Sequence, residues 1–546
     1  MSKGRGILGA VLLLGGTVAV AALIVSELMG PAGHGAAQAT TASPPSFADS
    51  AAFAPSLAPT AAFAAVVPTS APPTASKVPL VPVVSYWSTQ RSVSMLDITR
   101  LWLGTEDAFA QTHFQTLAIS PGDLGALAAA LALAPRGSVQ ILSPDGIKAA
   151  VRADTTTLGL IPAGDVTPDV RALALDGVSL FGSARIHDVS TWPLMVASTT
   201  DGTFSIGAEW TLAAGGDVNL DRRVYYKADQ LKYGPDYPWS AGYAFVPYYD
   251  CCGLDGSSLA VARDVGPAGA FRDRLADADL ALVNLEGSAP NDWITRDNSL
   301  VFTFDPALLI GLRNAGIDAV TLANNHIRNG GDSGVVETCQ NLDAANIEHT
   351  GAGADVVAAR QPAWLSAAGL RVAVLGYSAV GSPNWAAPDR AGAAPLDPAD
   401  VEADIRSARA AGAQIVIVMP HWGEEYSFAL SSEQKDDAAA FVAAGANLVL
   451  GSHSHWVGAV QSIDGPAGPA FVDYSLGDLL FNLNHDTRSQ EGVIATMTFS
   501  GTRLQQVDLQ PTVMIDGAQV GLMDPAGDGA AVLDDIRHAS RGLLDW

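Results

Sequence analysis

Cysteine is nearly absent from this sequence, which has 3 cysteines among 546 residues. Cys251 and Cys252 are adjacent and Cys339 is distant, so they allow at most one bridge to Cys339 with one thiol left over. No C-x-x-C pair occurs, which argues against a structural zinc site built on cysteine.

Basic residues are also scarce, with 30 Lys and Arg against 56 Asp and Glu and a formal net charge of −26. Proteins that bind nucleic acid neutralise phosphates with clustered Lys and Arg, so this composition argues against nucleic acid as a partner. It is typical of a soluble, self-repelling acidic surface. The length of 546 residues predicts two or three domains with tails.

A long uncharged apolar run lies at the N-terminus, from Ile7 to Ser26, and follows Lys3 and Arg5. A helix over these 20 residues would span the roughly 30 Å hydrocarbon core of a membrane. We therefore predict a signal anchor or transmembrane helix within residues 1–30. It would make the protein single-pass in the cell membrane, with its domains outside the cytoplasm. The alternative is secretion after cleavage near residues 37–39, a small-x-small site.

Two regions of different composition follow this run. Residues 31–82 are rich in Ala, Pro, Ser and Thr and almost uncharged, which predicts a disordered, partly extended tether. Residues 83–208 alternate strand-like and helical pieces, which predicts a small accessory α/β module. This module only weakly resembles a lobe of a periplasmic-binding-protein-like domain, and a structural or polymer-binding role is the preferred interpretation.

The region from residue 209 to residue 510 repeats a short apolar strand, a polar turn and a helix. Apolar strands that alternate with helices predict an α/β fold with mainly parallel strands, buried on both faces. Residues 511–546 form a C-terminal extension.

Side chains of the metal-ligand type stand at the ends of five expected strands. These are Asp217, Glu286, the Asn324-Asn325-His326 run, His421 with Glu424 nearby, and His453 with His455. Each alone has an ordinary explanation, such as a turn residue, a helix cap or a core histidine. Because the carboxyl ends of parallel strands meet at one edge of a sheet, the set predicts a metal centre. Imidazole with carboxylate suits a transition metal such as Mn, Fe or Zn better than calcium.

The histidine pair lies in the stretch Val449 to Trp456, VLGSHSHW. In an extended backbone, residues two apart point to the same side. We therefore expect His453 and His455 to reach one shared centre from an extended segment.

Several motifs together resemble the CapA family of capsule and poly-γ-glutamate biosynthesis, within the calcineurin-like metallophosphoesterase superfamily. The motifs are GGDVNLDR, DLALVNLEGS, LANNHIRNGG, PHWGEEYS, LVLGSHSHW and VDYSLGDLLFN, and they lie between residues 212 and 510. The resemblance implies layered sheets flanked by helices and a centre that holds one or two divalent ions.

The resemblance also implies roles for single residues. By their motif positions, the metal ligands would be Asp217, Glu286, Asn325, His421, His453 and His455. His326 would be the proton donor. Asn324, Glu424 and Tyr426 would lie in the cleft without assigned roles.

Three positions depart from the family pattern. Asn219 stands where the superfamily commonly has a ligand histidine, so one metal would bind loosely or be absent. Ser454 replaces a proline between the paired histidines. Asp478 replaces an asparagine and is either an extra metal-side carboxylate or a helix cap, of which the cap is the preferred interpretation.

Arg328 is the best candidate among the nearby arginines for holding a phosphate, the alternative being a solvated residue at a helix start.

Three functions are consistent with these residues. The leading hypothesis is a membrane-anchored protein that helps to make or export an anionic polymer such as poly-γ-glutamate, together with partners of a polymer-synthesis complex. The second is an exported metal-dependent phosphoesterase that acts on a phosphoester substrate. The third is a non-catalytic protein that binds polymer or cell wall and uses metal for structure.

Overall fold

The computed structural model describes residues 76–105, 113–198, 204–246, 262–296, 299–483, 485–544 and 546. The predicted transmembrane helix, most of the predicted tether, and both Cys251 and Cys252 lie outside the described residues. Within the ranges that the structure describes, no helix combines the length and the apolar character needed to cross a membrane.

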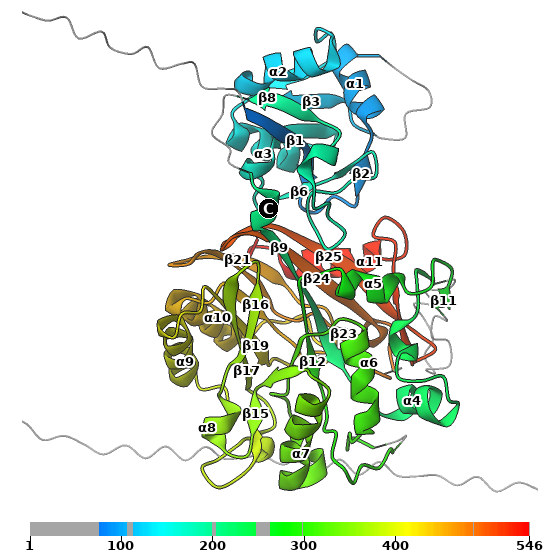
Figure 1. The fold of residues 1–546 in the computed structure, drawn as a ribbon, viewed down its shortest axis with the longest axis vertical. Helices are drawn as coiled ribbons and strands as arrows, with labels where there is room; N and C mark the ends of the chain where they lie inside the picture. The colour runs from blue at the N-terminus through cyan, green and yellow to red at the C-terminus, as the bar shows by residue number, and fades with distance from the viewer. Residues whose placement is uncertain are drawn as a thin grey trace, which may run out of the picture. The chain divides into compact units, whose positions relative to one another are not determined.

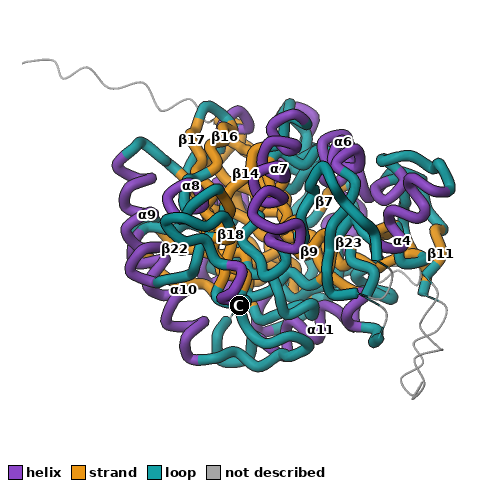
Figure 2. The backbone as a smooth tube through the Cα atoms, turned by 90° about the horizontal axis from the view of Figure 1, so that it is seen from below, coloured by secondary structure: helices purple, strands orange, loops and turns teal. Residues whose placement is uncertain are grey.

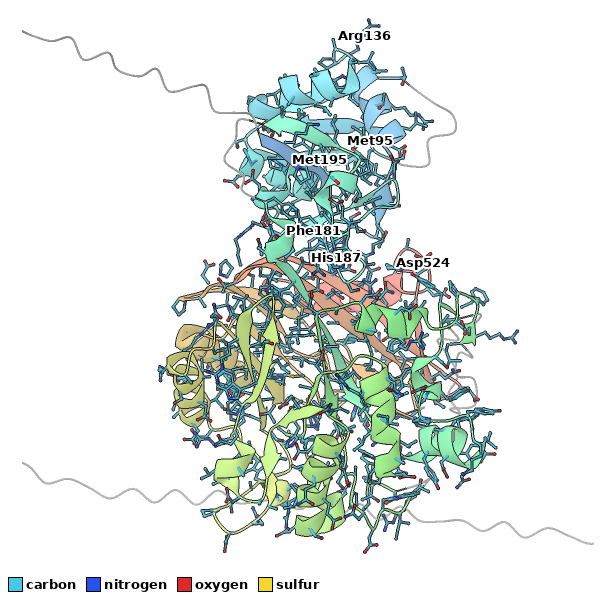
Figure 3. All side chains as sticks on the ribbon, viewed as in Figure 1. Met95, Arg136, Phe181, His187, Met195 and Asp524 are labelled. Carbon is cyan, nitrogen blue, oxygen red and sulfur yellow. The ribbon has the colours of Figure 1, made fainter. Side chains whose placement is uncertain are left out.

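The N-terminal module is a mixed six-stranded sheet with three helices (Figure 1). Its strands run in the order β4-β3-β5-β1-β6, and β8 also pairs with β1. The strands are β1 (Ser76–Ser85), β3 (Thr116–Ile119), β4 (Val139–Ile141), β5 (Thr157–Pro162), β6 (Val170–Ala172) and β8 (Met195–Ser198). The helices are α1 (Met95–Leu103), α2 (Pro121–Leu131) and α3 (Pro144–Ala153). Met95 and Met195, labelled in Figure 3, pack at the margin of its core.

Two further sheets, of eight and six strands, lie C-terminal to this module. The first has eight strands in the order β14-β13-β12-β9-β24-β25-β26, with β23 paired to β9. These are β9 (Glu209–Val218), β12 (Leu280–Leu285), β13 (Ala319–Thr321), β14 (Glu348–Thr350), β23 (Asp478–Leu480), β24 (Glu491–Ser500), β25 (Arg503–Ile515) and β26 (Gln519–Leu522).

The second sheet has six strands in the order β16-β17-β19-β20-β22-β21. These are β16 (Ala363–Ala367), β17 (Leu370–Ser378), β19 (Ile415–His421), β20 (Leu448–Leu450), β21 (Val460–Gly465) and β22 (Gly468–Asp473). Short pairs join β2 (Ser92–Val93) to β7 (Ala174–Leu175), β10 (Ala244–Phe245) to β11 (Arg263–Asp264) and β15 (Ala352–Gly353) to β18 (Gly392–Ala393).

Alternation along the strands packs these two sheets face to face. Leu212 of β9 and Val372 of β17 belong to one shared core, whereas their neighbours Ala213 and Ala373 belong to two separate cores on the outer faces. Successive side chains of a strand point to opposite faces, so each sheet is buried on both sides. The chain therefore forms a helix–sheet–sheet–helix arrangement, in agreement with the layered α/β fold expected.

Helices cover the two outer faces (Figures 1 and 2). The outer face of the eight-stranded sheet packs against α5 (Ala270–Ala276), α6 (Leu309–Asn314) and α7 (Gly331–Ala344). The outer face of the other sheet packs against α9 (Pro398–Ala410) and α10 (Ser432–Ala444). Shorter or peripheral helices are α4 (Arg222–Tyr225), α8 (Val356–Ala359) and α11 (Ala530–Ala539).

Two predicted boundaries need correction, and the expectation of mainly parallel strands holds for only part of the eight-stranded sheet. The strand β1 begins at Ser76, so residues 76–82 belong to the sheet rather than to the tether. The predicted boundary at residue 510 falls inside β25, and α11 contributes Val532 and Ile536 to the core between the sheets. The eight-stranded sheet is parallel over β9, β12, β13 and β14 but antiparallel over β24, β25 and β26. The antiparallel hairpin of β24 and β25, followed by β26, explains why the sheet is partly antiparallel and why it continues past residue 510. Such a hairpin extends an existing sheet without a crossover helix.

Candidate metal centre

The predicted ligand residues come together, although they arrive from two sheets rather than one. Asp217 is on β9 and Glu286 directly follows β12 in the eight-stranded sheet, whereas His421 ends β19 in the six-stranded sheet. All three side chains are fully buried. The carboxyl ends of parallel strands in both sheets thus meet at one place, as expected for a ligand site of this fold class.

Asp217 is fixed by two hydrogen bonds. The Asn284 side chain donates to Asp217 Oδ1 at 2.6 Å, and the backbone N–H of His453 donates to Oδ2 at 3.1 Å. Asn284 was not among the predicted site residues. Its signal was present, because Asn284 and Glu286 are two apart at the end of one strand and so share a side of it.

A second set of contacts surrounds His421. Its Nε2 lies 2.9 Å from Asn325 Oδ1 and 3.1 Å from His453 Nδ1, while Nδ1 lies 2.9 Å from Ser452 Oγ. One amide oxygen and two ring nitrogens, all of them metal-ligand atoms, therefore point at one small volume.

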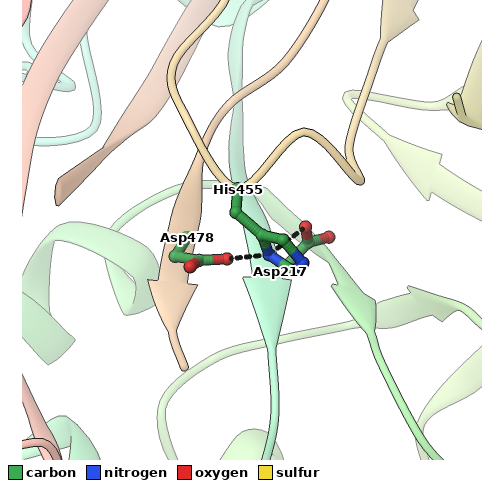
Figure 4. Close-up of side chains that lie close together, drawn as sticks. All are labelled: Asp217, His455 and Asp478. Atoms are coloured by element: carbon green, nitrogen blue, oxygen red, sulfur yellow. Dashed lines mark hydrogen bonds and ion pairs between the residues drawn. The ribbon is translucent and has the colours of Figure 1, made fainter. Parts of the chain in front are cut away.

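His455 pairs with Asp478, and both lie beside Asp217 (Figure 4). His455 Nδ1 lies 2.9 Å from Asp478 Oδ1 and 3.7 Å from Asp217 Oδ2. Asp478 begins the strand β23 and does not precede a helix, so the helix-cap interpretation is wrong. Instead, pairing of β23 with β9 places Asp478 beside Asp217.

The histidine pair reaches the centre for a different reason than the one expected. His453 has φ of 96° and His455 has φ of 59°, so both have left-handed backbone conformations and the segment is not extended. Such conformations cost of order 1–3 kcal/mol for residues other than glycine and cluster at functional sites. The turn separates the two rings by 6.3 Å between centroids, and they contact different partners, His421 for His453 and Asp478 for His455.

These residues form two groups that could each hold a metal ion. One group is Asp217, Glu286 and His421, and the other is Asp217, His455 and Asp478; within each, the ligand atoms lie within 4.8 Å of one another. Asp217 is common to both. Both carboxylate oxygens of Glu286 and one of Asp478 are buried without a hydrogen-bond partner among the described residues. Buried carboxylate oxygens without donors fit a cation, which would supply the missing partner.

The ionisation of the carboxyl groups also fits a cation. Burial raises the pKa of Glu286 well above its usual range, and the negative charge of Asp217 adds to this effect. Burial likewise raises the pKa of Asp217 and raises that of Asp478 to about 7. Three neighbouring carboxylates in a buried space cannot all ionise without a compensating positive charge.

The histidines differ among themselves. Burial lowers the pKa of His421 well below its usual range and lowers the pKa of His453 to about 3, so both are neutral at physiological pH. Burial acts in the same direction on His455, but Asp478, Glu286 and Asp217 outweigh it and raise the pKa of His455 to about 10. Neutral imidazole is the metal-binding form, so His455 would release a proton on binding a metal.

His326 lies at the margin of the group and is oriented by neighbours. Its Nδ1 lies 3.0 Å from Asn329 Oδ1, its Nε2 lies 3.7 Å from Glu286, and its ring packs on Phe302 with centroids 4.3 Å apart. Burial lowers the pKa of His326 to about 4. Asn324 supports the site from behind: its side-chain amide donates to the Leu285 carbonyl at 2.8 Å and to Asn284 Oδ1 at 3.3 Å, and its oxygen accepts from the His326 N–H at 3.1 Å.

The Asn219 side chain hydrogen-bonds to the backbone beside the site and does not contribute a ligand atom to either group. Its amide donates to the Glu286 carbonyl at 2.9 Å, and its oxygen accepts from the Asp221 N–H at 2.9 Å. Both functional atoms are therefore used to hold the backbone around Glu286.

Of the remaining residues predicted to lie in the cleft, some contact the site and others do not. Tyr426 stacks on His455 with centroids 5.5 Å apart, whereas Glu424 is exposed. Arg328 forms an ion pair with Asp332 and donates to the Pro383 carbonyl at 2.7 Å. The guanidinium of Arg222 lies 4.7 Å above the ring of Phe302, the ring that packs on His326, and it donates to the Ser299 carbonyl at 2.6 Å and the Asn482 carbonyl at 3.3 Å.

The family described as bacterial capsule synthesis protein PGA_cap matches residues 211–483, half of the 546-residue chain. The chain belongs to this family. The predicted resemblance to the CapA family is thereby confirmed. The match includes all the predicted metal ligands, from Asp217 to His455.

Individual relatives agree with this membership. Capsule biosynthesis protein CapA of Bacillus anthracis is 28% identical over 237 residues, 43% of this chain and 56% of CapA. A probable polyglutamine synthesis accessory protein of Mycobacterium tuberculosis is 33% identical over 190 residues, 32% of this chain and 50% of that protein. The chain thus spans about half the length of these relatives. Among solved structures, the calcineurin-like phosphoesterase YfkN of Bacillus subtilis is similar over 61% of this chain and 96% of the YfkN chain. The two are 12% identical and the TM-score is 0.30.

Proposed function

We propose that this PGA_cap family member is anchored in the cell membrane by its N-terminal segment and acts outside the cytoplasm in the synthesis or export of an anionic capsule polymer, such as poly-γ-glutamate. The observation that carries the proposal is the pair of buried ligand groups that share Asp217. The names of the two relatives, one for capsule and one for polyglutamine synthesis, favour a polymer and partners that assemble it. The apolar run before residue 27 supports the anchor.

Two divalent ions fit the centre by ligand type, with Mn, Fe or Zn preferred over calcium. Asp217, Glu286 and His421 would hold one ion, with Asn325 and His453 beside them, and Asp217, His455 and Asp478 would hold the other. When bound, the ions would supply positive charge for the oxygens of a phosphoryl group. The Asp478 carboxylate would compensate for the histidine that Asn219 replaces, so a second ion does not require position 219.

His326 would give a proton to the leaving group from Nε2 once that nitrogen has taken one up, because burial keeps the free imidazole neutral. Its Nδ1–H donates to Asn329 Oδ1, which leaves Nε2 facing Glu286 and the centre. Nε2 is therefore the atom at which His326 takes up or returns a proton. Its orientation depends on Asn329, which also accepts the backbone N–H of Phe302 at 2.6 Å and so holds the aromatic ring and the histidine together.

A phosphoesterase activity of the same centre is the second candidate, favoured by the placement of His326 beside the ligand groups. The full-length chain, loaded with manganese, should be assayed with a chromogenic phosphoester. Rapid turnover that is abolished in His326→Ala and retained in His349→Ala, a histidine outside the site, would favour the hydrolase. No turnover with intact metal binding would favour a role in polymer synthesis without phosphoester hydrolysis.

The polymer role is tested in cells. A strain that carries Asp217→Ala in place of the wild-type chain should lose most of its surface anionic polymer, while Asp464→Asn, an exposed carboxylate on β21, should not. Unchanged polymer in the Asp217→Ala strain, at equal protein abundance, would reject the proposed function.

A further inference from the structure

Three arginines that are far apart in the sequence converge on one aspartate. Arg91 Nη1 lies 3.0 Å from Asp508 Oδ1, Arg171 also pairs with Oδ1, and Arg274 pairs with Oδ2. Arg91 follows β1, Arg171 is on β6, Arg274 is on α5 and Asp508 is on β25. No spacing in the sequence brings these residues together, so the folded chain alone creates the cluster.

The cluster lines a pocket of about 500 Å³. Phe181 and Asp524, two further lining residues, are labelled in Figure 3. The charged residues of the lining are the three arginines with Asp508 and Asp524, so the pocket has a formal charge of +1 in a chain whose net charge is −26. Asp524 is partly engaged elsewhere, since its Oδ1 accepts the N–H of Ala526 at 3.0 Å.

The arginines are not satisfied by Asp508 alone. Arg171 is buried and also donates to the Tyr86 carbonyl at 3.1 Å, and Arg91 donates to the Leu509 carbonyl at 3.2 Å. Arg274, in contrast, makes one hydrogen bond in the described part of the chain, to Asp508, and its buried Nε has no partner there. A guanidinium carries five N–H donors in a planar fork, which matches a carboxylate.

We propose that this pocket binds a carboxylate of an acidic polymer strand and so gives the chain a second contact with its polymer, separate from the metal centre. An incoming carboxylate would neutralise the excess charge and accept from Arg274. Gln506, Ser179 and Ser183 also line the pocket, and their side chains are of types that hydrogen-bond to the amide groups of a polypeptide-like strand. The inference rests on the proposed function for the identity of the polymer, but its site does not include a metal ligand.

The test measures binding of a fluorescent decamer of γ-linked glutamate to the purified full-length chain by anisotropy, at low ionic strength and with excess chelator. The chelator removes metal-dependent binding, so the result is independent of whether the metal centre performs its proposed role. Arg274→Gln should bind about tenfold or more weakly, the loss expected for one charge-assisted hydrogen bond. Arg272→Gln, on the same helix but exposed and paired only with Asp273 among the described residues, should bind as the wild type does.

Asp508→Asn separates a binding site from a structural clamp. Removing the internal carboxylate raises the formal charge of the pocket, so this variant should bind the decamer at least as tightly as the wild type. Weaker binding by Asp508→Asn together with a lower melting temperature would show that the cluster only holds the fold, and would overturn the proposal. So would a wild-type chain that does not bind the decamer, or an Arg274→Gln variant that binds it normally. Displacement of the decamer by inorganic phosphate at equal charge would show a phosphate site instead and also overturn it.

Discussion

His455 Nδ1 lies 2.9 Å from Asp478 Oδ1, and both side chains adjoin Asp217 in the interior of the protein. This pair gives the centre a carboxylate at a position where the family pattern has an asparagine. A second group of ligand type therefore exists even though Asn219 does not point into the centre. The consequences can be measured.

The first prediction concerns Asp478. The Asp478→Asn substitution keeps the shape of the side chain and removes its charge, so we expect the affinity for the second ion to fall by more than the about 10–100-fold that is usual when a residue around the ligands is changed. Glu424→Gln removes an exposed carboxylate nearby and should leave the affinity unchanged. Metal titration followed by calorimetry makes the comparison, and equal affinities in the two variants would exclude Asp478 from the centre.

The second prediction concerns Asn219. Restoring the family histidine with Asn219→His should not improve metal binding, because it breaks the hydrogen bonds to the Glu286 carbonyl and the Asp221 N–H. Leaving these buried groups unpaired should destabilise the protein by about 1–3 kcal/mol. Denaturant unfolding and metal titration on the same samples test this. Tighter metal binding at unchanged stability would show that position 219 faces the centre after all.

The third prediction is a pH dependence of stability to which Asp473, at the end of β22 and not a member of either ligand group, contributes. Burial raises its pKa from 3.8 to about 8, so the folded state keeps a proton that the unfolded chain loses. The folded state therefore binds more protons between these values, and stability falls as pH rises from about 4 to about 8.

Asp473→Asn should remove this penalty and retain the hydrogen bond from the Ser475 N–H, which is 3.1 Å long. We expect the variant to gain about 1–3 kcal/mol over the wild type at pH 8 and little at pH 4. The exposed Asp464→Asn is the control and should show no such trend. A stability difference that is constant with pH would mean that Asp473 is ionised in the folded protein.

The fourth prediction compares two arginines. If the centre binds a phosphoester, Arg222→Gln should weaken binding of a phosphate-containing ligand about tenfold or more, and Arg328→Gln should have little effect. The reason is that Arg222 packs on Phe302 beside His326, whereas Arg328 is paired with Asp332. The reverse order of effects, measured by competitive inhibition, would restore Arg328 as the phosphate residue.

Much of the centre was predictable because strand ends are visible in the sequence. Asp217, Glu286, His421 and the histidine pair follow short apolar runs, and parallel strands present such ends together. Layered α/β architecture was predictable for the same reason, since runs buried on both faces require cover on both sides.

Other features depend on pairings that no local pattern reveals. Asp478 faces His455 because β23 pairs with β9, a contact across more than two hundred residues. Both histidines of the pair adopt left-handed φ values, which favour glycine. The presence of histidine at these positions does not predict this conformation. The arginine pocket joins residues 91, 171, 274 and 508, and only the tertiary fold brings them together.

The metal content of the purified full-length chain, measured by mass spectrometry after loading with manganese, iron or zinc, tests the central claim most directly. We predict that the wild type retains one to two divalent ions per chain after dialysis, and that Asp217→Ala, the residue common to both ligand groups, retains none while it still unfolds cooperatively. A wild-type chain that retains no metal under any loading condition, or an Asp217→Ala variant that retains as much as the wild type, would contradict the account.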